Sequence, residues 1–262
     1  GKDAFQEIDI AGVTMPITKH NFFVNRIEDL ADTLREAFVI AQSGRPGPVL
    51  VDITKDVTAA TYEYENKRPL PLRPDPEIRK DDIRAAVKMI NAAEKPVMYV
   101  GGGVMQSCAG ELVQELARKA NIPVVNTLMA TGVMDTEDDL CLGMVGMHGS
   151  VAANRAIQHA DLIIALGARF SDRVTGKLDE FAPNAKVIHI DIDPAEIGKI
   201  REANVPIVGD AQGILDAAAS VEQRTLRGFD ERRRLPAADA LCLDPLALQD
   251  ADKRYCVGAG IN

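Results

Sequence analysis

The sequence predicts an α/β fold whose main part is a parallel sheet with helices on both faces. Between about residues 79 and 220, short apolar runs such as 162–166 alternate with segments of helical periodicity. Strands and helices that alternate in this way are typical of parallel sheets built from crossover units. Several of the apolar runs also lead into glycine-rich or charged loops. We therefore expect a Rossmann-like sheet that binds a ligand at the carboxyl ends of its strands.

Composition excludes several classes of protein. The 262 residues carry a formal net charge of −9, contain no tryptophan and are only 4% aromatic, which disfavours a nucleic-acid partner. No apolar run reaches the roughly 20 residues that span a bilayer, and no signal pattern opens the chain, so we expect no membrane partner and a cytoplasmic or organelle-matrix location. The four cysteines form no C-x-x-C pair, and we expect no metal site.

Residues 1–57 are expected to end one α/β domain, and residues 58–78 to link it to the next. Apolar side chains at spacings of three and four predict a helix over 27–42, which the segment Gly44-Arg45-Pro46-Gly47-Pro48 ends. The apolar run 49–53 then predicts a buried strand. The proline-rich sequence of 58–78 predicts an extended linker.

Residues 79–220 are expected to form the second domain, with helices and strands in alternation. We predict five helices: one over 81–93, one from a cap at Ser107 to residue 120, one that ends at 159, a short one after Asp193 and one that begins at 211. We predict strands over 96–100, 122–125, 161–166, 186–190 and 206–208. Residues 221–262 keep no helix or strand period and are predicted to form an atypical tail.

The loop 167–176 carries the strongest chemical signal. It reads Gly-Ala-Arg-Phe-Ser-Asp-Arg-Val-Thr-Gly and places Arg169 and Arg173 after a buried run. Guanidinium groups at such a position can hold phosphate or carboxylate in a bidentate way. Taken alone, the loop is equally compatible with two solvated or ion-paired arginines.

Other strand-end segments are ambiguous one by one. Gly101–Gly103 permit close backbone approach, yet they lack the G-x-G-x-x-G pattern and can form a mere tight turn. Asp191 and Asp193 suit either sugar hydroxyls or helix caps. Met147–Gly149 precede a helix whose amino terminus can face an anion. Together, without a metal cluster or a nucleophile elbow, these loops favour an extended dinucleotide or flavin over a hydrolase site.

An ordered set of motifs resembles the catalytic (large) subunit of acetolactate synthase from residue 1 to about 220. The motifs are Asp3–Glu7, Thr18–Asn21, Gly44–Val49, Asp52–Val57, Gly146–Gly149, Gly167–Gly176 and Asp191–Pro194. The resemblance implies a thiamine-diphosphate enzyme with three domains. Residues 1–57 would end the pyrimidine-binding domain, and 79–220 would form the central, FAD-binding domain.

The resemblance also implies a reaction and a set of partners. Pyruvate would be decarboxylated and joined to a second 2-oxo acid, pyruvate or 2-oxobutanoate, giving 2-acetolactate or 2-aceto-2-hydroxybutyrate in branched-chain amino-acid biosynthesis. The implied cofactors are thiamine diphosphate with Mg²⁺, and FAD in a structural role. The implied assembly is a homodimer or homotetramer, with a regulatory small subunit as a further partner.

Site residues follow from the resemblance position by position. Phe5, Gln6 and Lys55 would line the active site, and Arg173 would also pair with the second substrate's carboxylate. Ala4, Lys55, Met147 and Asp172 would border a channel where herbicides bind this family. FAD contacts would come from Arg45, Gly101, Gly102, Gly103, Thr127, Leu128, Met129, Met147, His148, Gly149, Gly167, Ala168, Arg169, Arg173, Val174, Asp191, Ile192, Gly209, Asp210 and Ala211.

The sequence also departs from the family. Ser171 and Thr54 stand where aspartate and proline are usual, and the family's activating glutamate and its Gly-Asp-Gly…Asn magnesium segment do not occur. We therefore expect a truncated, frame-shifted or partial-gene product that is inactive alone. The alternatives are a non-catalytic flavin- or nucleotide-binding module, or another thiamine-dependent enzyme such as pyruvate oxidase or glyoxylate carboligase. A NAD-dependent dehydrogenase is disfavoured because G-x-G-x-x-G does not occur.

Overall fold

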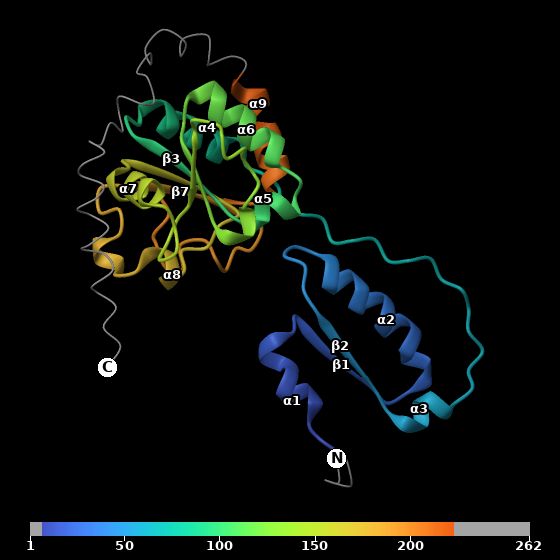
Figure 1. Ribbon diagram of the computed structural model, residues 1–262. Coiled ribbons are helices and arrows are strands. Elements are labelled where there is room, and N and C mark those ends of the chain that lie inside the picture. Colours follow the sequence, from blue (N-terminus) through green and yellow to red (C-terminus); the bar gives the residue numbers. More distant parts are fainter. Residues whose placement is uncertain (1–6, 223–262) are drawn as a thin grey trace, which may run out of the picture.

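The computed structural model describes residues 7–222, which form two α/β units with one parallel sheet each (Figure 1). The first unit has a two-stranded sheet and the second a six-stranded sheet. Residues 60–79 connect the units and contain neither helix nor strand. The predicted α/β class is therefore confirmed. Of the predicted tail, 221–262, the first two residues are helical and 223–262 lie outside the described residues.

The first unit is built around one strand–helix–strand crossover. Its elements are α1 (Ile10–Thr14), η1 (Met15–Ile17), β1 (His20–Val24), α2 (Ile27–Gln42), β2 (Val49–Ile53) and α3 (Lys55–Ala59). β1 and β2 pair in parallel, with His20 opposite Val49. The helix over 27–42 and the strand over 49–53 have the predicted bounds. β1 was not predicted, because its sequence His-Asn-Phe-Phe-Val begins with two polar residues and is short.

The second unit contains most of the secondary structure. Its elements are α4 (Lys80–Ala92), β3 (Pro96–Val100), α5 (Gly102–Gln106), α6 (Gly110–Ala120), β4 (Val124–Asn126), η2 (Leu128–Ala130), β5 (Cys141–Met144), α7 (Val151–His159), β6 (Leu162–Leu166), α8 (Asp172–Thr175), η3 (Leu178–Glu180), β7 (Lys186–Asp191), β8 (Val205–Val208) and α9 (Ala211–Glu222). The strand order is β5-β4-β3-β6-β7-β8, and every adjacent pair is parallel.

This order has a topological switch point between β3 and β6. From β3 the chain proceeds outward to β4 and β5, and from β6 it proceeds outward on the other side to β7 and β8. Doubly wound sheets that bind dinucleotides have the same order, and they bind their ligands outside the carboxyl ends of the strands at this point. The fold thus places the candidate site at the loops that follow β3 and β6.

Two apolar layers hold the six-stranded sheet between its helices (Figure 1). Met98, Val100 and Ile164 face the layer that includes residues of α4, α6 and α9. Val97 and Tyr99 face the opposite layer, which includes residues of α7. Successive side chains of a strand point to opposite faces, so a strand covered on both sides is apolar throughout. All residues of β3 and β6 are buried accordingly.

Three local predictions were wrong or incomplete. Ser107 ends α5 instead of capping the next helix, which begins at Gly110 without a side-chain cap. Residues 194–198 form turns instead of the short helix expected after Asp193. β5 was not predicted, because its sequence Cys-Leu-Gly-Met lacks β-branched residues and Gly143 adopts a φ of +82°. Within residues 7–222, no helix is both long and apolar enough to cross a membrane.

Candidate functional site

The loops after β3 and β6 touch each other at the switch point. The Gly101 amide donates to the Leu166 carbonyl (2.9 Å), and the Gly103 amide donates to the Gly167 carbonyl (3.1 Å). A Cβ on Gly101 would lie 2.2 Å from the Gly167 oxygen, and Gly167 itself has a φ of +54°. These glycines are therefore required for contact between the two loops, which is a stronger constraint than the tight turn considered from sequence alone.

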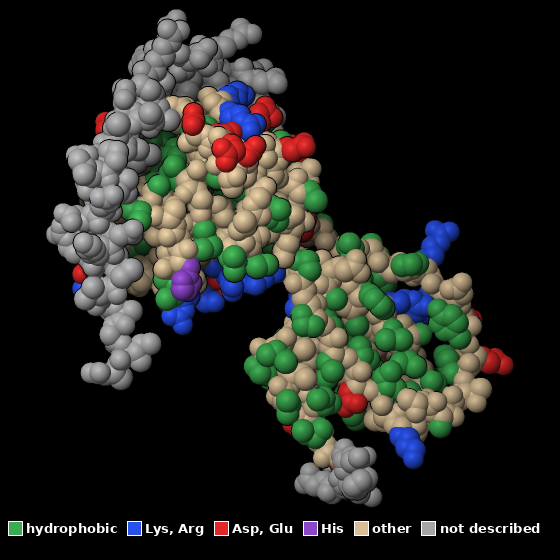
Figure 2. Space-filling view, in the orientation of Figure 1, with side chains coloured by type: hydrophobic (Ala, Val, Ile, Leu, Met, Phe, Trp, Pro, Cys, Tyr) green, Lys and Arg blue, Asp and Glu red, His purple; other side chains and the backbone are tan. Residues whose placement is uncertain are grey.

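A second contact brings the predicted segments 147–149 and 173–174 together. The Met147 amide donates to the Arg173 carbonyl (2.9 Å), and a Cβ on Gly146 would lie 2.7 Å from the same oxygen. Arg169 and Arg173 are both exposed, and the Arg173 Nε lies 4.0 Å from the Oδ2 of the adjacent Asp172. Figure 2 shows Lys and Arg side chains gathered along the lower edge of the larger unit, where Figure 1 places α8.

The loop after β4 adds apolar side chains and one unusual polar group. Leu128 and Met129 are 72% and 71% exposed, and Met147 in the neighbouring loop is 63% exposed. Met129 packs beside Gly102, since a Cβ on that glycine would lie 3.0 Å from the Met129 Cβ. The Thr127 hydroxyl is buried and has no hydrogen-bond partner within the described chain. Exposed methionines beside an unpaired hydroxyl suit a ligand with an apolar ring and polar substituents.

The acidic residues at the ends of β7 and β8 have local structural partners. Asp191 is buried, and burial raises the pKa of its carboxyl group, which accepts from the Asp193 amide (2.9 Å). Asp193 accepts from the Ala195 amide (3.0 Å), which stabilises a turn. Asp210 caps α9 by accepting from the Gln212 amide (3.0 Å). These bonds account for one oxygen of each carboxylate and keep the predicted residues at the same edge of the sheet.

Arg45 reaches this edge from the first unit. Its Nη1 lies 3.7 Å from the Asp193 Oδ2 and 3.7 Å from the Glu196 Oε1. The predicted residue Arg45 is thus close to Asp191 and Ile192, although the linker separates them in sequence. Because both ion pairs are long and Arg45 is about half exposed, the guanidinium can still interact with a ligand at the edge.

The structure does not bring every predicted residue together. Lys55 is exposed at the start of α3, after β2 in the first unit (Figure 1). Ala4, Phe5 and Gln6 lie outside the described residues. Apart from Arg45, the remaining predicted positions lie at the carboxyl ends of β3 to β8, in the last residue of β7 or in the loops and helices that follow the strands. Sequence reasoning assigned no role to three buried side chains. Tyr99 and His189 hydrogen-bond to backbone carbonyls of the loop 167–176 (the arginine loop), and the ring of Phe170, within that loop, packs against both. The only sequence signal was a histidine within the apolar run 187–190.

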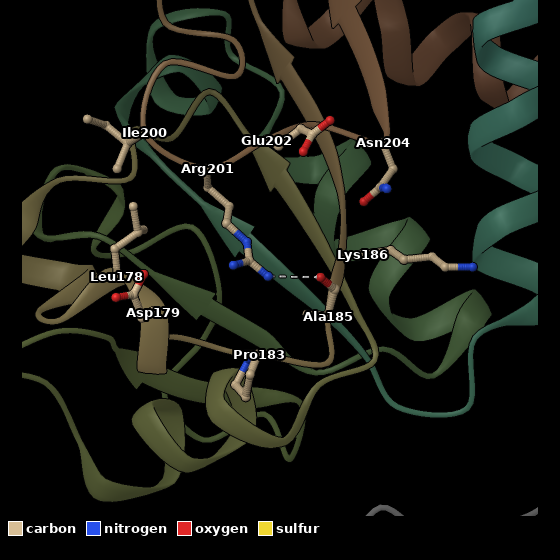
Figure 3. A pocket seen from close by; sticks show the side chains of 9 residues that line it. All are labelled: Leu178, Asp179, Pro183, Ala185, Lys186, Ile200, Arg201, Glu202 and Asn204. Atoms are coloured by element: carbon tan, nitrogen blue, oxygen red, sulfur yellow. Dashed lines mark hydrogen bonds between the residues drawn. The ribbon is translucent and has the colours of Figure 1, made fainter.

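A hollow of about 530 Å³ lies at the opposite, amino-terminal edge of the sheet (Figure 3). Its lining residues are Leu178, Asp179, Pro183, Ala185, Lys186, Ile200, Arg201, Glu202 and Asn204. The Arg201 guanidinium donates to the carbonyls of Ala182 (3.0 Å) and Ala185 (3.2 Å) and so braces the chain before β7. The hollow is separate from the switch point. Among residues 7–222, no group of three or more His, Cys, Asp or Glu side chains could hold a metal ion.

Sequence comparisons match the chain to known proteins of one family. The family model described as "Thiamine pyrophosphate enzyme, central domain" matches residues 83–218. An acetolactate synthase large subunit of Mycobacterium tuberculosis is 57% identical over 218 residues, covering 82% of this chain and 35% of the relative. The large subunit of Corynebacterium glutamicum is 46% identical over 285 aligned positions, covering 99% of this chain and 46% of the relative. The isozyme 1 large subunit of Escherichia coli is 46% identical over 254 residues, covering 94% and 45%.

Proposed function

Since the chain belongs to the thiamine pyrophosphate enzyme family through its central domain, we propose that it is part of an acetolactate synthase large subunit. The family match confirms the resemblance found in the sequence. The chain spans 35% to 46% of the length of these curated relatives. The reaction proposed below is therefore that of the whole enzyme, to which this chain contributes one domain and part of another.

The proposed reaction joins two 2-oxo acids. Pyruvate loses CO₂, and the remaining two-carbon unit adds to the carbonyl carbon of a second pyruvate or of 2-oxobutanoate. Thiamine diphosphate, bound with Mg²⁺, supplies the electron sink for this chemistry. From this chain, Arg173 would pair with the carboxylate of the second substrate, because an exposed guanidinium can donate two parallel hydrogen bonds to it. Lys55 would line the same active site from the first unit.

We further propose that FAD binds along the carboxyl edge of the six-stranded sheet. The observation that carries this proposal is the switch point, where the glycine loops after β3 and β6 meet beside two exposed arginines. The arginines suit the diphosphate of FAD, and the exposed Leu128, Met129 and Met147 suit its ring system. The buried Thr127 hydroxyl would gain a partner from a polar atom of the ligand. No redox step is needed, so FAD would be structural.

The assembly of the whole enzyme is also a proposal. We expect a homodimer or homotetramer, with a regulatory small subunit as a further partner, in the cytoplasm or an organelle matrix. For this chain alone we expect no carboligation, since the resemblance assigns the residues that activate thiamine diphosphate to segments outside its 262 residues.

Flavin retention tests the proposed site directly. The purified chain is mixed with FAD and desalted, and its visible absorbance is recorded; we expect a retained flavin band. Thr127→Val should weaken FAD binding, because it deletes a hydroxyl that the ligand would satisfy. The matched control is Thr58→Val, which deletes an exposed hydroxyl of α3. A chain that is folded by circular dichroism but flavin-free would contradict the proposal, as would equal losses in the two variants.

A further inference from the structure

The arginine loop rests on a cluster of buried side chains from β3 and β7. We propose that Tyr99 and His189 are positioning residues, which hold two successive carbonyls of the loop so that Arg169 presents its guanidinium to the diphosphate of the bound dinucleotide. The proposal rests on the proposed function for the identity of the ligand. The loop geometry itself follows from the contacts described below.

Tyr99 supplies the first hydrogen bond. Its side chain is 0% exposed near the carboxyl end of β3, and its hydroxyl donates to the Arg169 carbonyl at 2.8 Å. Burial raises the pKa of the Tyr99 phenol far above its ordinary value, so the hydroxyl keeps its proton. A buried tyrosine requires a partner for its hydroxyl, and here the partner is the backbone of the residue to be positioned.

His189 supplies the second hydrogen bond. Its side chain is 1% exposed on β7, and its Nε2 lies 3.1 Å from the Ala168 carbonyl. A carbonyl can only accept, so Nε2 carries the proton. Burial lowers the pKa of the imidazole, which is therefore neutral and leaves Nδ1 as an acceptor. Nδ1 is buried without a partner in the described chain, a cost that an apolar side chain at this position would avoid.

The ring of Phe170 packs against the two side chains that make these bonds and anchors the loop. Its ring lies 5.6 Å from Tyr99, 5.4 Å from His189 and 6.2 Å from Phe181, measured between centroids. Ala168 and Phe170 are 1% and 3% exposed, whereas Arg169 between them is exposed. The backbone of Ala168 and Arg169 is thus held on its inner side, and the outward direction remains for the Arg169 side chain. Pre-organised guanidinium groups bind diphosphate more tightly than mobile ones.

Titration of the chain with FAD tests the role of these two bonds. Tyr99→Phe retains the ring and deletes the hydroxyl, so we expect FAD affinity to fall about 2- to 10-fold, the range for loss of one hydrogen bond. His189→Leu should cause a similar loss, and His189→Gln should restore most of it because the amide nitrogen can donate to Ala168. Tyr64→Phe is the matched control, because it deletes an exposed hydroxyl of the linker that bonds Arg35.

Two further measurements separate positioning from a general loss of stability. The visible circular dichroism of bound flavin reports its surroundings, and we expect it to change in Tyr99→Phe and His189→Leu and to recover in His189→Gln. Thermal melting of each variant establishes that it is folded at the titration temperature. Unchanged FAD affinity and flavin signal in folded Tyr99→Phe and His189→Leu would overturn the proposal, even if the loop itself became looser.

Hydrogen exchange of residues 167–176 without FAD distinguishes the possible failures. Faster exchange in Tyr99→Phe than in wild type would support the two hydrogen bonds as the restraint on the loop. If wild-type protein retains no FAD while Tyr99→Phe still exchanges faster, the ligand assignment fails and the restraint stands. If exchange of this segment is the same in wild type, Tyr99→Phe and His189→Leu, the proposal is overturned whether or not FAD binds.

Discussion

The two units use similar apolar strands but bury them to different extents. β6, Leu-Ile-Ile-Ala-Leu, is buried at all five positions, whereas β2, Val-Leu-Val-Asp-Ile, is only partly buried at all five. β6 is the fourth strand of a six-stranded sheet with helices on both faces, and β2 belongs to a sheet of two strands. An apolar run therefore predicts a strand reliably, but its burial depends on how many neighbours the rest of the fold supplies.

Exposed apolar side chains also differ between the units. In the first unit they lie on a strand and on helices, as with Phe23 at 63% and Phe38 at 68%. In the second unit, the three most exposed large apolar side chains of the described residues are Leu128, Met129 and Met147, all in loops of the candidate site. A sheet that is well covered elsewhere thus concentrates its exposed apolar surface where a ligand is proposed to bind.

The largest difference in stability between the two units is expected when one glycine in each unit is replaced by alanine. Gly101→Ala should destabilise the six-stranded unit by about 3 kcal/mol or more, because its Cβ would meet backbone atoms at 2.2 and 2.5 Å. Gly47→Ala should cost less than about 1 kcal/mol, since its Cβ would meet only the Lys19 side chain at 3.1 Å, which can move. Urea unfolding followed by circular dichroism measures both.

Gly110→Ala serves as a control within the six-stranded unit. A Cβ there would have Val133 at 3.9 Å, an ordinary contact, and alanine favours the first turn of α6. Its stability should equal or exceed that of wild type. Equal stability of Gly101→Ala and Gly110→Ala would mean that the loops after β3 and β6 separate easily and do not form the close contact described above.

The six-stranded unit was largely predictable from the sequence because its signals are local. Buried strands such as 96–100 and 162–166 are continuous apolar runs, and helices such as α7 keep their period of three to four. β1 and β5 were missed because polar residues or glycine interrupt their short sequences. The strand order was not predictable in detail, since it depends on contacts between residues far apart in the chain.

The candidate site could likewise be predicted only in part from the sequence. Glycines and arginines that follow strands are visible in the sequence, and the structure brings most of them to one edge. Tyr99 and His189 were not identified, because the sequence of a strand does not reveal which loop its side chains hydrogen-bond to. Arg45 came only from the resemblance, and no periodicity places it near Asp193 across the linker.

A smaller effect is expected from pH, again confined to the six-stranded unit. Burial lowers the pKa of His189 below its ordinary value of about 6.5, so below that pH the unfolded chain binds a proton that the folded chain resists. Stability from this group is therefore complete above about pH 6.5 and is lost as the pH falls toward the lowered value. The free energy of unfolding should therefore be smaller at about pH 5.5 than at about pH 7.5.

Urea unfolding at about pH 7.5 and pH 5.5 measures this loss. His189→Gln should reduce the pH dependence, because glutamine does not titrate. His20→Gln, at an exposed position at the start of β1, is the control for the replacement of a histidine by glutamine in the first unit. An unchanged dependence in His189→Gln would show that the acid sensitivity does not come from His189.

The smallest effect concerns the ion pairs between the units. Arg45 is 49% exposed and its carboxylate partners lie at 3.7 Å, a geometry in which pairs contribute less than about 1 kcal/mol. A double-mutant cycle with Arg45→Gln and Asp193→Asn should give a coupling free energy within this range, and it should disappear in about 1 M salt. Asparagine retains an oxygen that can accept from the Ala195 amide, so the turn stays intact. A coupling free energy well above 2 kcal/mol that persists in salt would mean that the two units unfold together. The units would then still differ in how deeply their strands are buried, but not in their stability.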